Sequence, residues 1–237
     1  MNILCSLAVI TLAALVHASF QLSVSVLTLL SSHALGAKKS QSKLLHLTTS
    51  FLAGSGLMTI LLLSSISLVL ITIFKEGIPP ILWAIVFGLL IGTAFAIWLF
   101  YYRHEKGTTL WIPRNIASYL TSRIKSTKLG AEAFGLGLSS IVGEILFIIA
   151  PLVVSALAII QLPTAWQLIG IILYTIISML SLIIVWVLIG SGHSVSQIQR
   201  WRESNKKFLQ FAAGAGLSVL AIFIYVNEFL ATVVGKI

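Results

Sequence analysis

The chain has 237 residues, of which 58% are hydrophobic and only 9% are charged. Soluble proteins carry about 25% charged residues, so this composition excludes an ordinary soluble domain and indicates a polytopic helical membrane protein. The formal net charge is +9, but the basic residues fall between hydrophobic runs, which argues for topology signals and against nucleic-acid binding. The single cysteine, Cys5, excludes dithiol chemistry within the chain.

The first hydrophobic run, residues 3–35, is too long for one straight span. One interpretation is a signal peptide with a cleavage site at Val16-His17-Ala18. Because the preceding Met1-Asn2 carries no positive side chain, we favour a long, tilted or kinked helix. Its hydroxyls serve either helix packing or the lining of a polar pathway: Ser19, Ser23, Ser25, Thr28, Ser31 and Ser32.

Five further runs predict membrane spans over residues 44–74, 81–102, 133–160, 165–189 and 208–234. The second span carries Ala53-Gly54-Ser55-Gly56, a patch of small residues that predicts close approach of another helix. In the fourth span Gly135, Ser139 and Gly143 recur every four residues and predict a second such seam.

Residues 103–130 form the one long polar connector and divide the chain into two three-helix halves, residues 1–102 and 131–237. Apolar side chains recur there at helical spacing while the basic side chains avoid that stripe. Pro113 suits the first turn of a helix. We therefore expect an amphipathic helix over residues 113–127 that lies on the membrane surface and binds anionic lipid headgroups.

The distribution of charge predicts the orientation of the chain. With six spans, the first, third and fifth loops share one side of the membrane, and they hold 13 of the 15 Lys and Arg residues. The positive-inside rule makes that side cytoplasmic, so both termini face outward. We expect a multi-pass protein of a prokaryotic inner (plasma) membrane.

Three spans in each half mean that the halves enter the membrane in opposite directions. The start of the first half, Phe20-Gln21-Leu22-Ser23, shares its Phe and Leu spacing with Phe134-Gly135-Leu136-Gly137 of the second. Together these features predict an all-α fold with a 3+3 inverted repeat, an architecture common in transporters.

The six-span plan, the Phe-x-Leu-x-Leu start of the fourth span and the basic loop before the last span resemble the lysine-exporter superfamily. That group includes amino-acid exporters, nickel and cobalt effluxers and thiol-electron conduits of cytochrome biogenesis. His33-Ala34-Leu35-Gly36 is similar to a segment of the nickel-type effluxers, although Ala37 follows where their motif continues to a second histidine. The Pro-Cys pair of the conduits and the Pro-Gly-Pro of the amino-acid exporters are absent. The resemblance implies export of a small solute or metal ion.

Glu144 lies near the middle of the fourth span, where a carboxyl group costs about 3 kcal/mol to insert. It acts either as a hydrogen-bonded link between helices or as an ion-coupling site, since acids inside membranes mark ion pathways. Close to Glu144, Pro151 has no N–H, so the carbonyl of Phe147 loses its usual helical hydrogen bond. The predicted pathway residues are Glu144, Ser139, His17, Ser25 and His33.

Four histidines fall near the cytoplasmic ends of different spans: His33, His46, His104 and His193. Imidazoles at one level can hold a metal or haem. None has a histidine partner one helical turn away, and histidine is also tolerated at any membrane interface. We keep them as weak metal candidates and expect no cofactor.

Two function classes account for these features. The first is a small transporter or exporter, coupled to protons or another ion, for a small solute or metal ion. The second is a membrane subunit or scaffold that does not transport and binds a partner protein. We expect no enzyme, because the chain has no Asp, no Cys pair and no protease motif. Expected partners are the lipid bilayer, a small solute or ion, and either further copies of the chain or a partner membrane protein.

Overall fold

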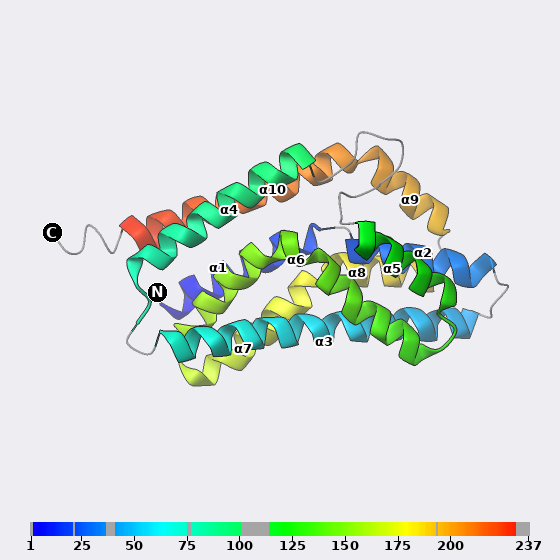
Figure 1. The fold of residues 1–237 in the computed structure, drawn as a ribbon, viewed down its shortest axis with the longest axis horizontal. Coiled ribbons are helices and arrows are strands. Elements are labelled where there is room, and N and C mark those ends of the chain that lie inside the picture. The colour runs from blue at the N-terminus through cyan, green and yellow to red at the C-terminus, as the bar shows by residue number, and fades with distance from the viewer. Residues whose placement is uncertain are drawn as a thin grey trace.

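The computed structural model describes residues 2–20, 22–36, 41–74, 77–100, 114–192 and 194–230. The described residues form helices and no strand, and the long helices run along one elongated bundle (Figure 1). In chain order the elements are α1 (Ile3–Ala18), α2 (Leu22–Gly36), α3 (Gln41–Ile73), α4 (Pro80–Phe100), α5 (Arg114–Ser126), α6 (Gly130–Ile160), α7 (Thr164–Ser178), α8 (Leu180–Gly190), α9 (Val195–Ser204), α10 (Lys206–Ile224) and the π-helix η1 (Tyr225–Leu230).

Four of these helices are each long and apolar enough to cross a bilayer: α3, α4, α6, and α10 continued to Glu228. Two further pairs reach that length only together, α1 with α2 bent by 45° and α7 with α8 bent by 50°. The described residues therefore hold four to six candidate spans, in agreement with the predicted helical membrane protein. The amphipathic segment predicted over residues 113–127 is helical, as α5.

The break between α7 and α8 was not predicted, because the sequence stays apolar from residue 165 to 189. It falls at Met179, which ends α7 and precedes α8. Just before it, Ser178 Oγ donates a hydrogen bond to the carbonyl of Thr175 at 3.0 Å, and Thr175 Oγ1 donates to that of Ile171 at 2.8 Å. Hydroxyls that bond back onto their own helix compete with the backbone ladder and favour bends.

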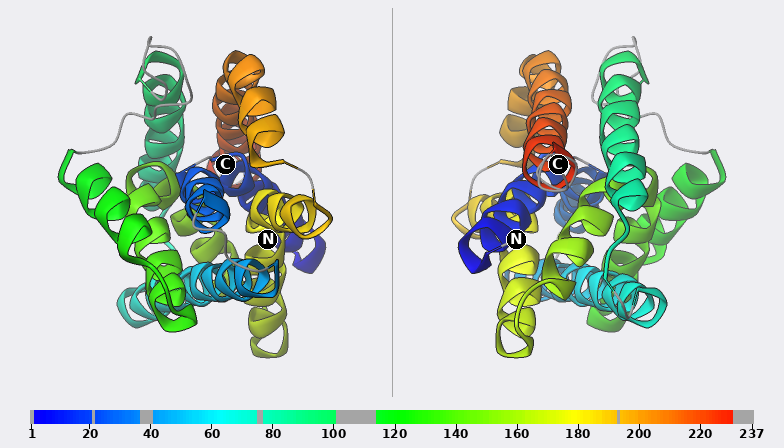
Figure 2. Two further views of the ribbon diagram at one scale, coloured as in Figure 1. Left: turned by 90° about the vertical axis from the view of Figure 1, so that its right-hand side faces the viewer. Right: turned by 90° about the vertical axis from the view of Figure 1, so that its left-hand side faces the viewer.

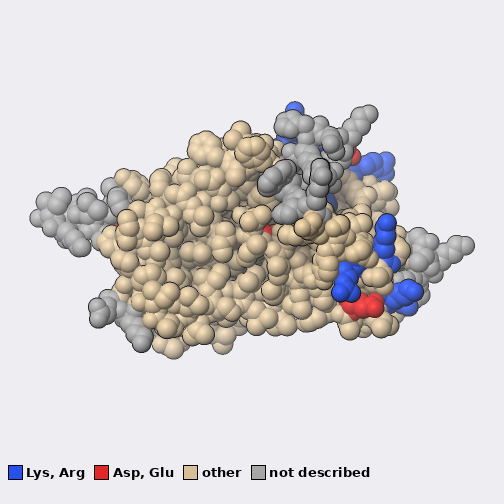
Figure 3. Space-filling model, viewed as in Figure 1, with Lys and Arg blue, Asp and Glu red and all other residues tan. Residues whose placement is uncertain are grey.

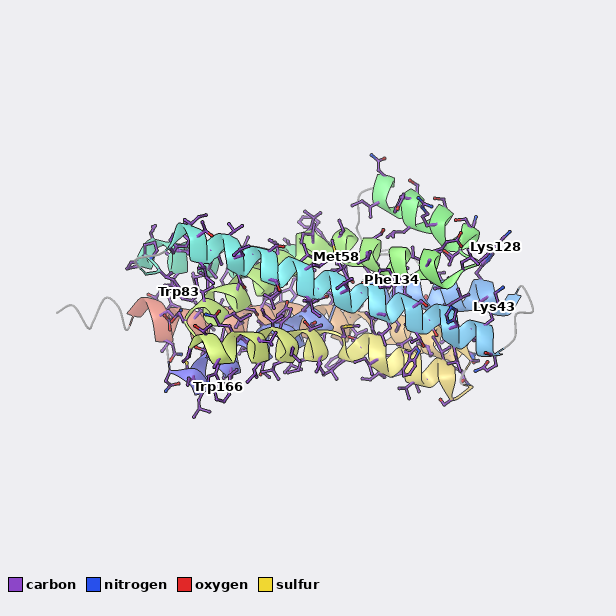
Figure 4. The ribbon with its side chains drawn as sticks, turned by 90° about the horizontal axis from the view of Figure 1, so that it is seen from below. Lys43, Met58, Trp83, Lys128, Phe134 and Trp166 are labelled. Atoms are coloured by element: carbon purple, nitrogen blue, oxygen red, sulfur yellow. The ribbon has the colours of Figure 1, made fainter. Side chains whose placement is uncertain are left out.

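Helices α3 and α6 pack against each other (Figure 4), and glycines bring their backbones into contact. A Cβ atom added to Gly54 would overlap the carbonyl of Phe134, and one added to Gly137 would overlap that of Phe51. Ser55 Oγ donates across the seam to the carbonyl of Gly137 at 3.3 Å. The small-residue patch of the second span thus makes the predicted backbone contact.

The stripe predicted on the fourth span does not form such a seam. Around Gly135 an added Cβ would meet no atom within 4 Å, and around Gly143 it would meet only side chains, Leu22, Ile116 and Leu120. The residue in backbone contact is Gly137, which lies off the four-residue repeat. The prediction was wrong because small residues show where close approach is allowed and do not show on which face the partner lies.

Helices α4 and α10 lie side by side as a second pair along one side of the bundle (Figures 1 and 2). Gln210 Nε2 donates to the carbonyls of Ile97 at 2.7 Å and Trp98 at 2.9 Å. Gly214 lies directly against the indole of Trp98. Gly216 lies against Val16, so small residues of α10 also allow it to pack against α1.

The two ends of the bundle differ in chemistry. Lys and Arg side chains gather at one end, near α5 and α9 (Figure 3). Lys43 and Lys128 lie at that end, whereas Trp83 and Trp166 lie toward the other (Figure 4). Helix α1 begins, and η1 ends, at the end of the bundle opposite the basic residues (Figure 1).

Candidate functional site

Glu144 lies where the first span is broken. Only 3% of the residue is exposed, and its carboxylate faces the start of α2. The backbone N–H of Ser23 donates to Oε1 at 2.8 Å, and the hydroxyl of Ser23 donates to Oε2 at 3.0 Å. The first amides of a helix have no partner within it and carry partial positive charge. A carboxylate from α6 therefore binds the amino-terminal end of α2 in the interior of the protein.

The second broken span meets the first at the same level. Ser181, the second residue of α8, donates its hydroxyl to the carbonyl of Ala18, the last residue of α1. One residue earlier, Nδ1 of His17 lies 2.9 Å from the hydroxyl of Tyr174 on α7. Both side chains are buried. Two polar side-chain contacts thus join the two bent helix pairs close to their bends.

A small cavity of about 10 Å³, about the space of one water molecule, lies between these breaks. Its polar lining comes from six helices: His17 (α1), Ser23 (α2), Thr59 (α3), Glu144 (α6), Ser178 (α7) and Ser181 (α8). The carboxylate is therefore bordered by hydroxyls and an imidazole, which are groups able to hold a proton, a water molecule or a small cation.

A larger cavity of about 390 Å³ adjoins the small one toward the basic end of the bundle. The two share Val24 and Ser181 as lining residues. Beyond them the larger cavity is bordered by α8, α9 and the start of α10, and it includes Arg202 of α9. Arg202 is 2% exposed, and its guanidinium interacts electrostatically with Glu144.

Of the predicted pathway residues, Glu144 and His17 line the same small cavity. Ser25 does not reach it: Arg202 Nη2 donates to Ser25 Oγ at 2.7 Å. His33 is exposed near the end of α2. The structure thus brings together two of the five.

Ser139 belongs to a different surface. Its hydroxyl donates to the carbonyl of Gly135 at 2.9 Å and faces α5, where it bonds to the hydroxyl of Tyr119. That bond, with a second from Arg123, lowers the pKa of Tyr119. Glu144 follows Ser139 by five positions, and this spacing turns the two side chains to different faces of α6.

Two of the four weak metal candidates, His33 and His46, lie in the described part of the chain. His46 is exposed beside Gly130, at the start of α6, and His33 is on α2. His104 and His193 lie outside the described residues. Within the described part of the chain, no three His, Cys, Asp or Glu side chains are placed to hold a metal ion.

Sequence reasoning missed four residues of this region: Ser23, Tyr174, Ser181 and Arg202. Ser23 stands beside the Phe20-Gln21-Leu22 segment and was counted only among the hydroxyls of its helix. Arg202 was counted only as a topology charge, although it follows Val195 and Ile198 on the buried face of α9.

Comparisons of the chain with protein-family models, with curated proteins and with solved structures find no match.

Proposed function

We propose that the protein is a small ion-coupled membrane transporter and that Glu144 is its coupling site. The observation that carries this proposal is the carboxylate of Glu144 on the free amides of a broken helix, where two broken spans meet. Broken helices with polar side chains at mid-membrane form the substrate and ion sites of many secondary transporters. An acid there is costly to bury and can exchange a proton or hold a cation.

The contacts between helices support a 3+3 inverted repeat. When α1–α2, α3 and α4 are taken as the first half and exchanged with α6, α7–α8 and α10, each contact between these spans maps onto itself or onto another such contact. The first spans of the halves touch each other (α1 and α2 with α6), and so do the third spans (α4 with α10). The second span of each half packs on the first span of the other: α3 on α6, and α7 and α8 on α1 and α2. The same plan is implied by the resemblance to the lysine-exporter superfamily.

The symmetry of this proposed repeat is incomplete, and the difference falls at the site. Spans one and five are broken, whereas their counterparts by symmetry, α6 and α3, are single helices. The helix α6 passes through Pro151 without a break. A transporter alternates between two conformations, and halves that differ in conformation allow one to rock against the other around the site.

The larger cavity indicates which side of the membrane the proposed site faces in this structure. It extends from the basic end, which we place in the cytoplasm by the positive-inside rule, to the edge of the Glu144 cavity. The His17–Tyr174 pair packs on the other side of that site. We therefore assign this structure to an inward-facing state of an inner-membrane protein whose termini face out.

Capacitive currents on a solid-supported membrane test the function. Proteoliposomes of the full chain are challenged with jumps in pH, in Na⁺ and in a panel of amino acids, organic anions, organic cations and divalent metals. We expect a transient current for at least one ion that protein-free liposomes do not give. Absence of any protein-dependent current, together with one stoichiometric protein that co-purifies with the chain, would replace transport with the subunit function.

A further inference from the structure

The larger cavity has the size and the chemistry of a ligand site. Its volume of about 390 Å³ lies within the range of small-molecule pockets, and its walls are mostly aliphatic. Apolar side chains come from α2, α8, α9 and α10: Val24, Ile184, Val185, Leu188, Ile198 and Leu209. The charged member of the lining is Arg202.

The sequence of α9 places that arginine on its buried face. Val195, Ile198 and Arg202 follow one another at spacings of three and four, so they share one side of the helix, and all three are buried. Arg200, two residues before, is exposed. Arg202 is held in place from α2, since its Nη2 donates to Ser25 Oγ at 2.7 Å.

A buried guanidinium is costly and favours an anionic ligand. Arginine binds carboxylates through two parallel N–H donors, a geometry that a lysine ammonium does not offer. A charge removed from bulk water interacts more strongly with an ion that enters the same cavity. The aliphatic walls would at the same time remove the hydrocarbon part of a ligand from water.

We propose that this cavity binds the transported solute and that the solute is a small carboxylate with an apolar body. The carboxylate lies on Arg202, and the apolar body lies among Val185, Leu188 and Leu209. The deep end of the site reaches Ser181, which also borders the Glu144 cavity. The bound anion is thus close enough to influence the ion held at Glu144. This assignment rests on the proposed transport function.

Hexanoate is the probe, measured by isothermal titration on the full chain in nanodiscs of zwitterionic lipid. Hexanamide and hexylammonium keep the apolar body and change the charge. We expect hexanoate to bind at least tenfold more tightly than either. Equal binding of hexanamide would show a purely apolar cavity and would overturn the proposal. Loss of hexanoate binding in nanodiscs of anionic lipid would assign Arg202 to lipid headgroups and would also overturn it.

Two variants locate the site. Arg202→Gln should weaken hexanoate binding at least tenfold, whereas Arg200→Gln, on the exposed face of the same helix, should leave it unchanged. If Arg202→Gln fails to fold, Val185→Phe occupies the cavity without changing charge and should abolish binding. Unchanged binding in Val185→Phe would place the anion elsewhere.

Measuring the ion-driven current and hexanoate binding on the same wild-type preparation separates this inference from the proposed function. An ion-driven current without hexanoate binding would leave the transport function standing and would refute the anion site alone. Hexanoate binding without any current would refute transport, and with it the role of hexanoate as solute.

Discussion

The backbone amide and the hydroxyl of Ser23 both donate to the carboxylate of Glu144, at 2.8 and 3.0 Å. This pairing joins α2 to α6. It gives an amide at the start of α2 an acceptor that the helix itself cannot supply.

Glu144→Leu should destabilise the protein strongly, because the amide and hydroxyl of Ser23 would both lose their acceptor. A buried donor without a partner costs about 1 to 3 kcal/mol. Glu144→Gln keeps one carbonyl oxygen for the amide and should cost less. Thermal unfolding in nanodiscs measures both. Equal midpoints for the two variants would show that these hydrogen bonds do not stabilise the fold.

Gly137→Ala should loosen the α3–α6 seam, because its new methyl group overlaps the backbone carbonyl of Phe51. Forcing an extra carbon into a packed interface costs about 1 to 3 kcal/mol. Gly135→Ala is the matched control on the same helix, since its methyl group meets no atom within 4 Å. There the higher helix propensity of alanine should leave stability unchanged or raise it by up to about 1 kcal/mol. A larger loss for Gly135→Ala than for Gly137→Ala would contradict the observed seam.

Tyr174→Phe should weaken the contact between α1 and α7 by removing the hydroxyl that lies 2.9 Å from Nδ1 of His17. The expected loss is about 1 kcal/mol. A double-mutant cycle with His17→Leu measures the pair itself, and we expect its two losses not to add. Additive losses would show that the two residues do not interact.

The long elements could be predicted from sequence because hydrophobic length and periodicity determine them. The fourth run, expected over residues 133–160, is α6 (Gly130–Ile160), and the helix expected within residues 113–127 is α5 (Arg114–Ser126), whose location on the membrane surface stays a prediction. Glu144 stood out because an acid in the middle of an apolar run is rare.

The partners of Glu144 could not be predicted in the same way. Ser139 was preferred because it is near in sequence, but its hydroxyl faces α5, and the carboxylate binds Ser23, 121 residues away. Which face of α6 meets α2 depends on how all the helices pack. The break at Met179 is equally hidden, because it depends on local hydroxyl bonding within a sequence that stays apolar.

The proposed topology predicts which positions a membrane-impermeant thiol reagent reaches in sealed cells. In a Cys5→Ser background, cysteines at Ser40 and Lys125 should react only after the membrane is opened, because both positions belong to basic cytoplasmic loops. A cysteine at Gly77, in the turn before α4, should react from outside. Labelling of position 40 or 125 in sealed cells would reverse the orientation.

The most direct test of the coupling role compares Glu144→Gln with Glu132→Gln in proteoliposomes. Glu132 is exposed at the start of α6, where its carboxylate accepts hydrogen bonds from the amides of Lys128 and Leu129. Glu132→Gln is therefore a control that makes the same chemical change outside the candidate site. Both variants should insert and keep a folded structure. If Glu144 exchanges an ion during transport, Glu144→Gln should lose the ion-driven current while Glu132→Gln retains it. A folded Glu144→Gln variant with the current and ion dependence of the wild type would exclude the coupling role and leave Glu144 as a link between helices.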